Sequence, residues 1–393
     1  MSKAVIVSAV RTAIGTSFKG TLAHTPPERL ATRVLEESIR RAGISPGDVD
    51  DVVMAESLQG GGDIARYAAI EAGMISVPGQ SVNRHCAGGL TSVAHGAAAI
   101  MSGMAQVMVA GGVQSSSRAP VLTWPVPGQP ETSREGMAPT YPYTDGPGDD
   151  VTLTVGWNVA LKYGLTRERM DSWATRSHAR ACAAIDSGVF TEEVVPVEVT
   201  TSEGSLTEFS VDEHPRRDTS VERLRQLKPL HPEIEGFSIT AGNASGINDG
   251  AAALTLTSED FARKHSLTAL ASVRAWAAVG VDPYVTGSGA IEAIRRVLDR
   301  TGMSVGDVDL WEINEAFASV PVAACQELDI DESIVNPFGS GCSLGHPVAA
   351  SGARMLTTLV HQLRRAGGGV GVAAMCAGGG QGGAVVIDVA GRA

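Results

Sequence analysis

At 393 residues the chain is long for a single core, and about 150 residues per domain predicts two or three domains. Its formal charge of −12 argues against a general affinity for nucleic acid or anionic membranes, so an anionic ligand would need a local basic patch. Gly is abundant (46 residues) while aromatics make up only 4%, which favours close backbone approach over large aromatic anchors.

The cysteines indicate a reducing compartment. There are five, an odd number, and no CxxC or Cys/His pair has zinc spacing, so no metal site is predicted. The first residues show no basic-then-apolar signal pattern. Two long uncharged stretches, 95–117 and 367–387, are broken by Gly, Ser and Gln and are interpreted as helix-turn-strand or hairpin segments. We expect a soluble cytoplasmic protein that binds neither membrane nor nucleic acid.

In chain order, an apolar strand at 4–7 is followed by an amphipathic helix around 28–41 and a turn at 42–50. That turn returns at 301–309, an offset of 259, after a second amphipathic helix around 290–300. A second echo pairs 110–114 with 377–381, an offset of 267. Two echoes in the same order predict two homologous α/β halves.

The middle of the chain differs from both halves. It holds most of the prolines, polar loops and charged helices such as 167–187. We predict an N-terminal half of residues 1–117 plus 249–268, a loop domain of 118–248 that recognises substrate, and a C-terminal half of 269–393.

Two segments carry the first candidate catalytic residues. Cys86 precedes small residues that begin a helical pattern, and the free N–H groups of a helix start stabilise a thiolate. Its alternative is a buried, inert cysteine. His346, in a Gly-His-Pro segment, is expected at a strand-to-helix junction at the matching point of the second half, where packing of the halves would bring it to Cys86. A satisfied core or surface histidine is its alternative.

Two more segments are weaker signals taken alone. Cys376 ends a strand before a glycine loop that includes Gly378, whose backbone N–H groups can stabilise an oxyanion, although a plain hairpin turn fits as well. Asn314 and Glu315 follow an apolar run and would offer an amide and a carboxylate to a cleft, or merely cap a helix.

Together these segments resemble the thiolase family over essentially the whole chain. The matching stretches, in the family's order, are VSAVRT at 7–12, NRHCAGGL at 83–90, SRAP at 117–120, GNASGINDG at 242–250, NEAF at 314–317, GHP at 345–347 and CAGGG at 376–380. The resemblance implies two similar five-stranded halves in α-β-α-β-α layers, with a loop domain inserted in the first.

The resemblance also implies roles. Cys86 would take the acyl group, His346 would activate it, and Cys376 would exchange a proton with the acetyl carbon. Asn314 would hold a water that, with His346, stabilises an enolate oxygen, and the Cys86 and Gly378 N–H groups would form a second oxyanion hole. CoA and acyl-CoA are then substrates, with no permanently bound cofactor.

Positions implied to contact CoA are Ser245 and Ala241 in the pantetheine tunnel, Arg216 near the nucleotide, and Ala316; a solvated loop arginine is the alternative for Arg216. A homodimer or homotetramer is implied by the resemblance alone.

The chain departs from the family at several places. They are His85 where Gln is common, NPFGS at 336–340, VTL at 151–153 where short-chain members often have His-Met-Gly, Trp157 for Glu, and Cys342 for a small apolar residue. The segment 151–157 would shape the acyl pocket, so acetoacetyl-CoA is not implied as the sole substrate. Other readings are a ketosynthase-like condensing enzyme, a cysteine hydrolase, or a silent acyl-CoA-binding scaffold.

Overall fold

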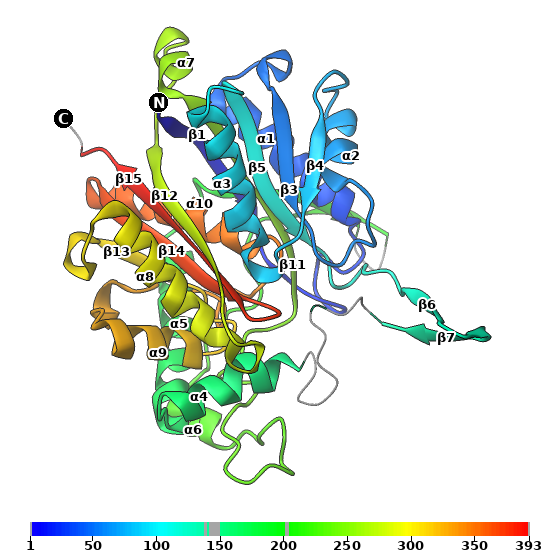
Figure 1. Cartoon of the computed structure of the whole chain (residues 1–393), viewed down its shortest axis with the longest axis vertical. Coiled ribbons are helices and arrows are strands. Elements are labelled where there is room, and N and C mark those ends of the chain that lie inside the picture. Colours follow the sequence, from blue (N-terminus) through cyan, green and yellow to red (C-terminus); the bar gives the residue numbers. More distant parts are fainter. Residues whose placement is uncertain (1, 137–139, 141–149, 201–203, 392–393) are drawn as a thin grey trace.

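The computed structural model describes residues 2–136, 140, 150–200 and 204–391 (Figure 1). The first half-sheet and its helices, in chain order, are β1 (Ala4–Thr12), β2 (Gly15–Thr16), α1 (Pro27–Ala42), β3 (Asp51–Ala55), α2 (Ile64–Glu71), β4 (Gly79–Val82), α3 (Gly88–Met101), β5 (Val107–Gln114), β11 (Asn248–Ser258) and α7 (Glu259–Lys264).

The second half repeats this plan. Its elements are β12 (Ala271–Gly280), α8 (Gly289–Thr301), β13 (Leu310–Ile313), α9 (Ser319–Leu328), α10 (Ser351–Ala366), β14 (Gly369–Ala377) and β15 (Gln381–Val389). The segment between β5 and β11 contains β6 (Thr123–Val126), β7 (Gln129–Glu135), the π-helix η3 (Thr152–Trp157), α4 (Asn158–Lys162), α5 (Arg167–Asp186), β8 (Val194–Val195), β9 (Val197–Thr200), β10 (Leu206–Phe209) and α6 (Val221–Arg225).

Strand order confirms the predicted duplication. The main sheet runs β13-β14-β15-β12-β1-β11-β5-β3-β4, so the two halves are mirrored about the β12–β1 junction. Counted outward from this junction, the first two strand pairs of each half are antiparallel and the third is parallel. The counterpart of β4 in the second half is reduced to a parallel bridge between Trp311 and Val335.

Small irregularities recur as well. Bulges in β1 and β12 fall at Val7 and Arg274, which differ by the offset of the second sequence echo. Helices α1 and α8 both end at a glycine in the left-handed conformation, Gly43 and Gly302, which differ by the offset of the first echo. Gly accepts this conformation without the steric penalty of a side chain. The repeated turn is therefore a helix cap.

The helices form three layers around the two half-sheets, as the family resemblance implied. Helix α1 packs on β1, β11 and β5, and α8 packs on β12, β15 and β14. Helices α3 and α10 pack on each other and on strands of both halves. A buried apolar cluster joins this middle layer to both half-sheets, through Leu90, Leu356, Leu254 and Ile387 among others. Figure 1 shows α8 and α1 on opposite sides of the molecule.

A buried ion cluster ties the inserted segment to the scaffold. The Arg11 guanidinium in β1 donates to Glu193 Oε1 at 2.6 Å and to both carboxylate oxygens of Asp212 at 2.8 and 2.9 Å. Thr358 in α10 donates to the same Glu193 oxygen at 3.0 Å. All three charged side chains are almost fully buried. The two carboxylates hold the Arg11 pKa above its ordinary value, although burial alone would lower it.

Candidate active site

The starts of α3 and α10 meet backbone to backbone. A Cβ atom on Gly89 would lie 2.5 Å from the backbone N of Ala353, and one on Gly352 would lie 2.3 Å from the N of Leu90. Only glycine allows such an approach. The crossing brings together the segments that precede the two helices, which carry Cys86 and His346.

Cys86 lies in the short 3-10 helix His85–Ala87 that leads into α3, and it is half-buried. Burial raises the pKa of its thiol to about 11, while hydrogen bonds from the N–H groups of Gly378 and of Cys86 itself act in the opposite direction. Burial therefore outweighs the helix start that the sequence suggested would stabilise a thiolate. The resting group is a thiol that needs a base.

Cys376 lies at the end of β14, one residue before the β14–β15 turn, and is 1% exposed. Burial, followed by the charge of an ionised Cys86, raises the pKa of its thiol well above the ordinary range. The two thiols, one from each half, are therefore close enough that ionising one disfavours ionising the other. The sequence prediction that Cys376 ends a strand before a glycine turn is confirmed.

His346 is buried beside the start of α10. Its backbone N–H donates to Asn248 Oδ1 at 3.0 Å, and its ring Nδ1 lies 2.6 Å from Ser351 Oγ. Burial, followed by the Arg354 guanidinium, lowers the pKa of His346 to about 3. The imidazole is therefore neutral at neutral pH and able to accept a proton.

Asn314 follows β13, which pairs in parallel with β14, the strand that carries Cys376. Its amide nitrogen lies 3.4 Å from Nδ1 and 3.5 Å from Nε2 of His346. Its Oδ1 is buried and has no hydrogen-bond partner among the described residues. Asn314 thus faces the histidine and offers an open acceptor.

Glu315 does not face the cleft, contrary to the interpretation of the sequence. Its carboxylate accepts hydrogen bonds from Trp173 Nε1 at 2.9 Å, Ser177 Oγ at 2.6 Å and Asn336 Nδ2 at 2.9 Å. The backbone N–H of Cys342 donates to it as well, at 3.1 Å. A buried carboxylate with this many donors holds the fold together around Asn314.

His85, which departs from the family pattern, has a left-handed backbone with a φ of 44°. Its ring Cγ lies 3.4 Å from where a Cβ on Gly378 would stand, so the ring lies against the glycine turn and not away from it. Its Nε2 is 3.2 Å from Thr140 Oγ1. A strained residue next to the thiol is an expected feature of a functional site.

The positions implied to contact CoA divide into two groups. Ser245 donates its backbone N–H to the Ala316 carbonyl at 2.9 Å, which places this pair beside Asn314. Ala316 is only 7% exposed, so its side chain offers little surface to a ligand. Ala241 and Arg216 are exposed, and the Arg216 backbone N–H donates to His178 Nδ1 at 3.0 Å.

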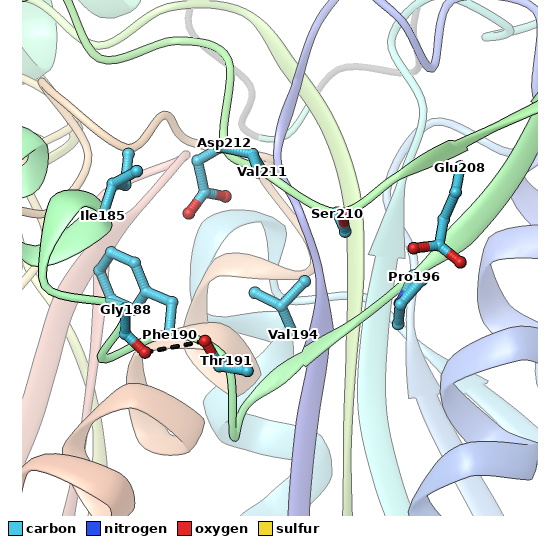
Figure 2. Close-up of a pocket in the computed structure, with 10 residues that line it drawn as sticks. All are labelled: Ile185, Gly188, Phe190, Thr191, Val194, Pro196, Glu208, Ser210, Val211 and Asp212. Carbon is cyan, nitrogen blue, oxygen red and sulfur yellow. Dashed lines mark hydrogen bonds between the residues drawn. The ribbon is translucent and has the colours of Figure 1, made fainter.

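Two cavities flank the β9–β10 hairpin, away from the thiols. One of about 320 Å³ is lined by Phe190 and Asp212 among others (Figure 2), and one of about 460 Å³ lies between the hairpin and α1. In the first, Asp212 is already engaged by Arg11, which leaves its carboxylate little capacity for a ligand. Neither cavity includes a predicted site residue.

Sequence reasoning missed two partners of His346. Asn248 lies inside the matched 242–250 stretch but carried no assigned role, and Ser351 lies five residues after the histidine. A hydroxyl at the first turn of the following helix was the available signal.

Within the described residues, no group of three or more His, Cys, Asp or Glu side chains is placed to hold a metal ion. No described helix is long and apolar enough to cross a membrane.

This arrangement of two thiols, a neutral imidazole and an amide on a duplicated α/β scaffold defines a class of acyl-transferring enzyme. Residues 4–260 match the thiolase N-terminal domain and residues 267–389 match the thiolase C-terminal domain. The chain belongs to the thiolase family and is an acyltransferase of that family.

Named relatives agree over nearly full length. The chain is 42% identical to acetyl-CoA acetyltransferase of Pseudomonas aeruginosa, covering 98% of this chain and 99% of the relative, and 41% identical to the cytosolic acetyl-CoA acetyltransferase of Mus musculus, covering 98% of each. Two crystal structures superpose over 99% of both chains. They are acetyl-CoA acetyltransferase of Bacillus anthracis, with a TM-score of 0.90 and 37% identity, and human mitochondrial 3-ketoacyl-CoA thiolase, with 0.88 and 35%.

Proposed function

We propose that this thiolase cleaves 3-ketoacyl-CoA with CoA, and runs the reverse Claisen condensation, through an acyl group carried on Cys86. The observation that carries the proposal is the packing of the short helix that carries Cys86 against β14, the strand of the other half that carries Cys376, with the Gly378 N–H hydrogen-bonded to the Cys86 thiol. The relatives named as acetyl-CoA acetyltransferases support a CoA thioester as substrate.

In the cleavage direction, His346 takes the Cys86 proton and the sulfur attacks C3 of the 3-ketoacyl group. The C2–C3 bond breaks, its electron pair moves to C2, and Cys376 protonates C2 to release acetyl-CoA. The thiol of free CoA then gives its proton to the Cys376 thiolate and attacks the acyl-Cys86 thioester, and Cys86 leaves as a thiolate that recovers its proton from His346. A buried thiol suits the protonation of C2 because a carbanion is a far stronger base than a thiolate.

Two kinds of group would stabilise oxygen charge during these steps. In the resting site the backbone N–H groups of Cys86 and Gly378 both donate to the Cys86 sulfur. During the reaction they would donate to the oxyanion of the tetrahedral intermediates instead. Asn314, through a held water, and His346 would serve the enolate oxygen. Losing one oxyanion donor typically raises a barrier by roughly 2.7–4 kcal/mol.

The CoA substrate would lie along the Ser245–Ala316 contact, with Arg216 as the partner for its phosphates. The exposure of Ala241 and Arg216 supports this path. We propose CoA only as a substrate, with no permanently bound cofactor and no metal.

The acyl pocket is expected to differ from that of a short-chain thiolase. Residues 152–157 of the departing segment form a π-helix, a form that often marks functional sites. Its Gly156 is packed so closely on Phe317 that a Cβ there would lie 3.0 Å from the Phe317 ring. Kinetics across 3-ketoacyl-CoA chain lengths would define the preference.

Replacing Cys86 with Ala tests the proposal. We expect the variant to lose thiolysis of every 3-ketoacyl-CoA that the wild type cleaves, and to lose exchange of labelled CoA into acetyl-CoA. A ketosynthase-like enzyme would require a malonyl thioester or carrier protein, and a silent binder would show no exchange even as wild type. Full thiolysis by Cys86→Ala would refute the assignment.

We further propose a cytoplasmic homo-oligomer, dimer or tetramer. Strand β4 ends the sheet, and Tyr67, Ile70 and Ile75 near it are 44–66% exposed, as expected of a surface that another copy covers. The β6–β7 hairpin projects from the body (Figure 1) and offers a second contact. All five cysteines are free, which supports a reducing compartment. Light scattering on the purified chain would give the number of copies.

A further inference from the structure

The ring of His346 is held on one side by Ser351. Nδ1 of the histidine lies 2.6 Å from Ser351 Oγ, and both residues are buried, Ser351 completely. Ser351 is the first residue of α10, so the contact is built into the start of a long, well-packed helix. The ring orientation is therefore set by the same helix whose crossing with α3 forms the site.

The direction of this hydrogen bond follows from a third atom. Ser351 Oγ lies 2.9 Å from the Pro347 carbonyl, four residues earlier, in the back-bonding geometry common for serine in helices. A carbonyl only accepts and a hydroxyl has one proton. When the hydroxyl donates to Pro347, its lone pair faces Nδ1, and Nδ1 must carry the proton of this short contact.

A neutral ring has only one proton to place. Burial and the Arg354 guanidinium keep His346 uncharged at neutral pH, and Arg354 is itself paired with Glu312 at 3.2 Å. With the proton on Nδ1, Nε2 presents a lone pair. The other tautomer would present an N–H from Nε2 and could accept no proton there.

We propose that Ser351 is a positioning residue that fixes the Nδ1–H tautomer of His346 and so keeps Nε2 available as the base for thiol protons. The inference rests on the proposed role of His346 in acyl transfer. Ser351 acts through the ring and not on the substrate, so its loss is expected to lower kcat about ten- to hundredfold with little change in the KM for CoA.

Three variants test this proposal. Ser351→Ala removes the hydroxyl, while the Pro347 carbonyl keeps its bonds from the N–H groups of residues 350 and 351 at 3.0 and 2.8 Å, so the helix start is retained. Ser351→Thr restores a hydroxyl. Thr357→Val is the matched control, because Thr357 lies in the same helix, is fully buried, and its hydroxyl has no partner in the described part of the chain. We expect low kcat only in Ser351→Ala, with Ser351→Thr recovering most of it.

Nitrogen NMR of histidine-labelled enzyme supplies a readout that a purely structural role would not move. The His346 signals are those missing from a His346→Gln variant among the nine histidines. We expect a protonated Nδ1 and an unprotonated Nε2 in the wild type, and a tautomer mixture in Ser351→Ala. A protonated Nε2 in the wild type, or wild-type kcat in Ser351→Ala, would overturn the proposal. If His346→Gln itself kept wild-type kcat, the catalytic role of His346 would fail instead, whatever Ser351 does.

Discussion

Burial sets the reactivity of each thiol in this site. A pKa of about 11 for Cys86 and a still higher one for Cys376 mean that neither is ionised at rest. His346, the proposed base, is also uncharged. The resting enzyme thus carries no thiolate–imidazolium pair. Charge is expected to develop only when a thioester oxygen accepts hydrogen bonds from the backbone N–H groups of Cys86 and Gly378. Such a thiol is protected from oxidation between turnovers, because the thiolate is the reactive form.

Replacement of Cys376 is expected to affect a different half of the reaction from replacement of Cys86. In Cys376→Ser, acyl transfer between CoA and Cys86 needs no proton at carbon and should continue, so exchange of labelled CoA into acetyl-CoA stays within severalfold of wild type. Thiolysis of 3-ketoacyl-CoA should fall by about 10²–10⁴, the usual value of a general acid.

Cys182→Ser is the control, since that thiol lies in α5 and belongs to no part of the site. Equal loss of exchange and thiolysis in Cys376→Ser would show that this cysteine is not dedicated to the carbon–carbon step.

At this scale, the sequence singled out the candidate site residues because their types and order are specific, and their catalytic roles stay predictions. It did not single out the partners of His346. Ser351 and Asn248 are ordinary polar residues, and their importance depends on distances that exist only after β11 and α10 have packed against the histidine. The inward turn of Glu315 was hidden for the same reason, because its donors lie in α5 and near residue 336.

Among the elements, the crossing of α3 and α10 sets the positions of the segments that carry Cys86 and His346. Gly89→Ala is expected to force the helices apart, because its new Cβ would meet backbone atoms that cannot rotate away. Overpacking of this kind costs about 1–3 kcal/mol. We expect a lower midpoint in urea unfolding and, since Cys86 would shift from His346, a loss of thiolysis larger than stability alone explains.

Gly96→Ala in the same helix provides the contrast. Its Cβ would lie 3.4–3.5 Å from Met108 and Ala110, which is ordinary contact. Replacing a mid-helix glycine with alanine should leave activity intact and stabilise by up to about 1 kcal/mol. Identical behaviour of the two variants would mean that the crossing is not constrained at Gly89.

Regular elements were predictable from periodicity, and α1, α5 and α8 lie where the amphipathic patterns placed them. The π-helix η3 was not, because a widened turn inserts a residue without changing residue types in a recognisable way. Its position follows from packing, since Gly156 presses on Phe317 and Ser319 Oγ donates to the Val155 carbonyl at 3.4 Å.

For the molecule as a whole, the Arg11 cluster joins parts that are distant in sequence. Arg11→Ala would leave Glu193 and Asp212 buried without their cation, which typically costs about 3–5 kcal/mol. Chemical denaturation should show this loss. Arg263→Ala, which breaks an exposed pair with Asp260, should leave the midpoint nearly unchanged. A small effect of Arg11→Ala would indicate that water reaches the cluster.

Acid should destabilise the fold through buried histidines. Burial, aided by His214 and Arg216, lowers the pKa of His178 to about 4, whereas an unfolded histidine titrates near 6.5. The unfolded state therefore gains the proton first, and stability falls as pH drops from about 6.5 towards 4. Between pH 7 and pH 5 this one residue should remove about 2 kcal/mol.

His178→Gln should reduce that pH-dependent loss by the same amount, measured by urea unfolding at both pH values. The exposed His24 serves as control, and His24→Gln should leave the slope unchanged. Glu312, whose pKa burial raises to about 7, acts in the opposite sense, so the comparison between variants is more informative than the wild-type curve. An unchanged slope in His178→Gln would contradict the assignment.

Strands β1 and β12 pair at Val5 with Ser272 and at Ile6 with Ala271, so hydrogen bonding runs unbroken from one half of the molecule into the other. Moving the halves apart would break the hydrogen bonds between β1 and β12 and separate α3 from α10. We therefore expect the two halves to keep their relative position, so that the distance between the Cys86 and Cys376 sulfurs stays constant through turnover. Admission and release of the long CoA thioester are then expected to proceed without separation of the two halves.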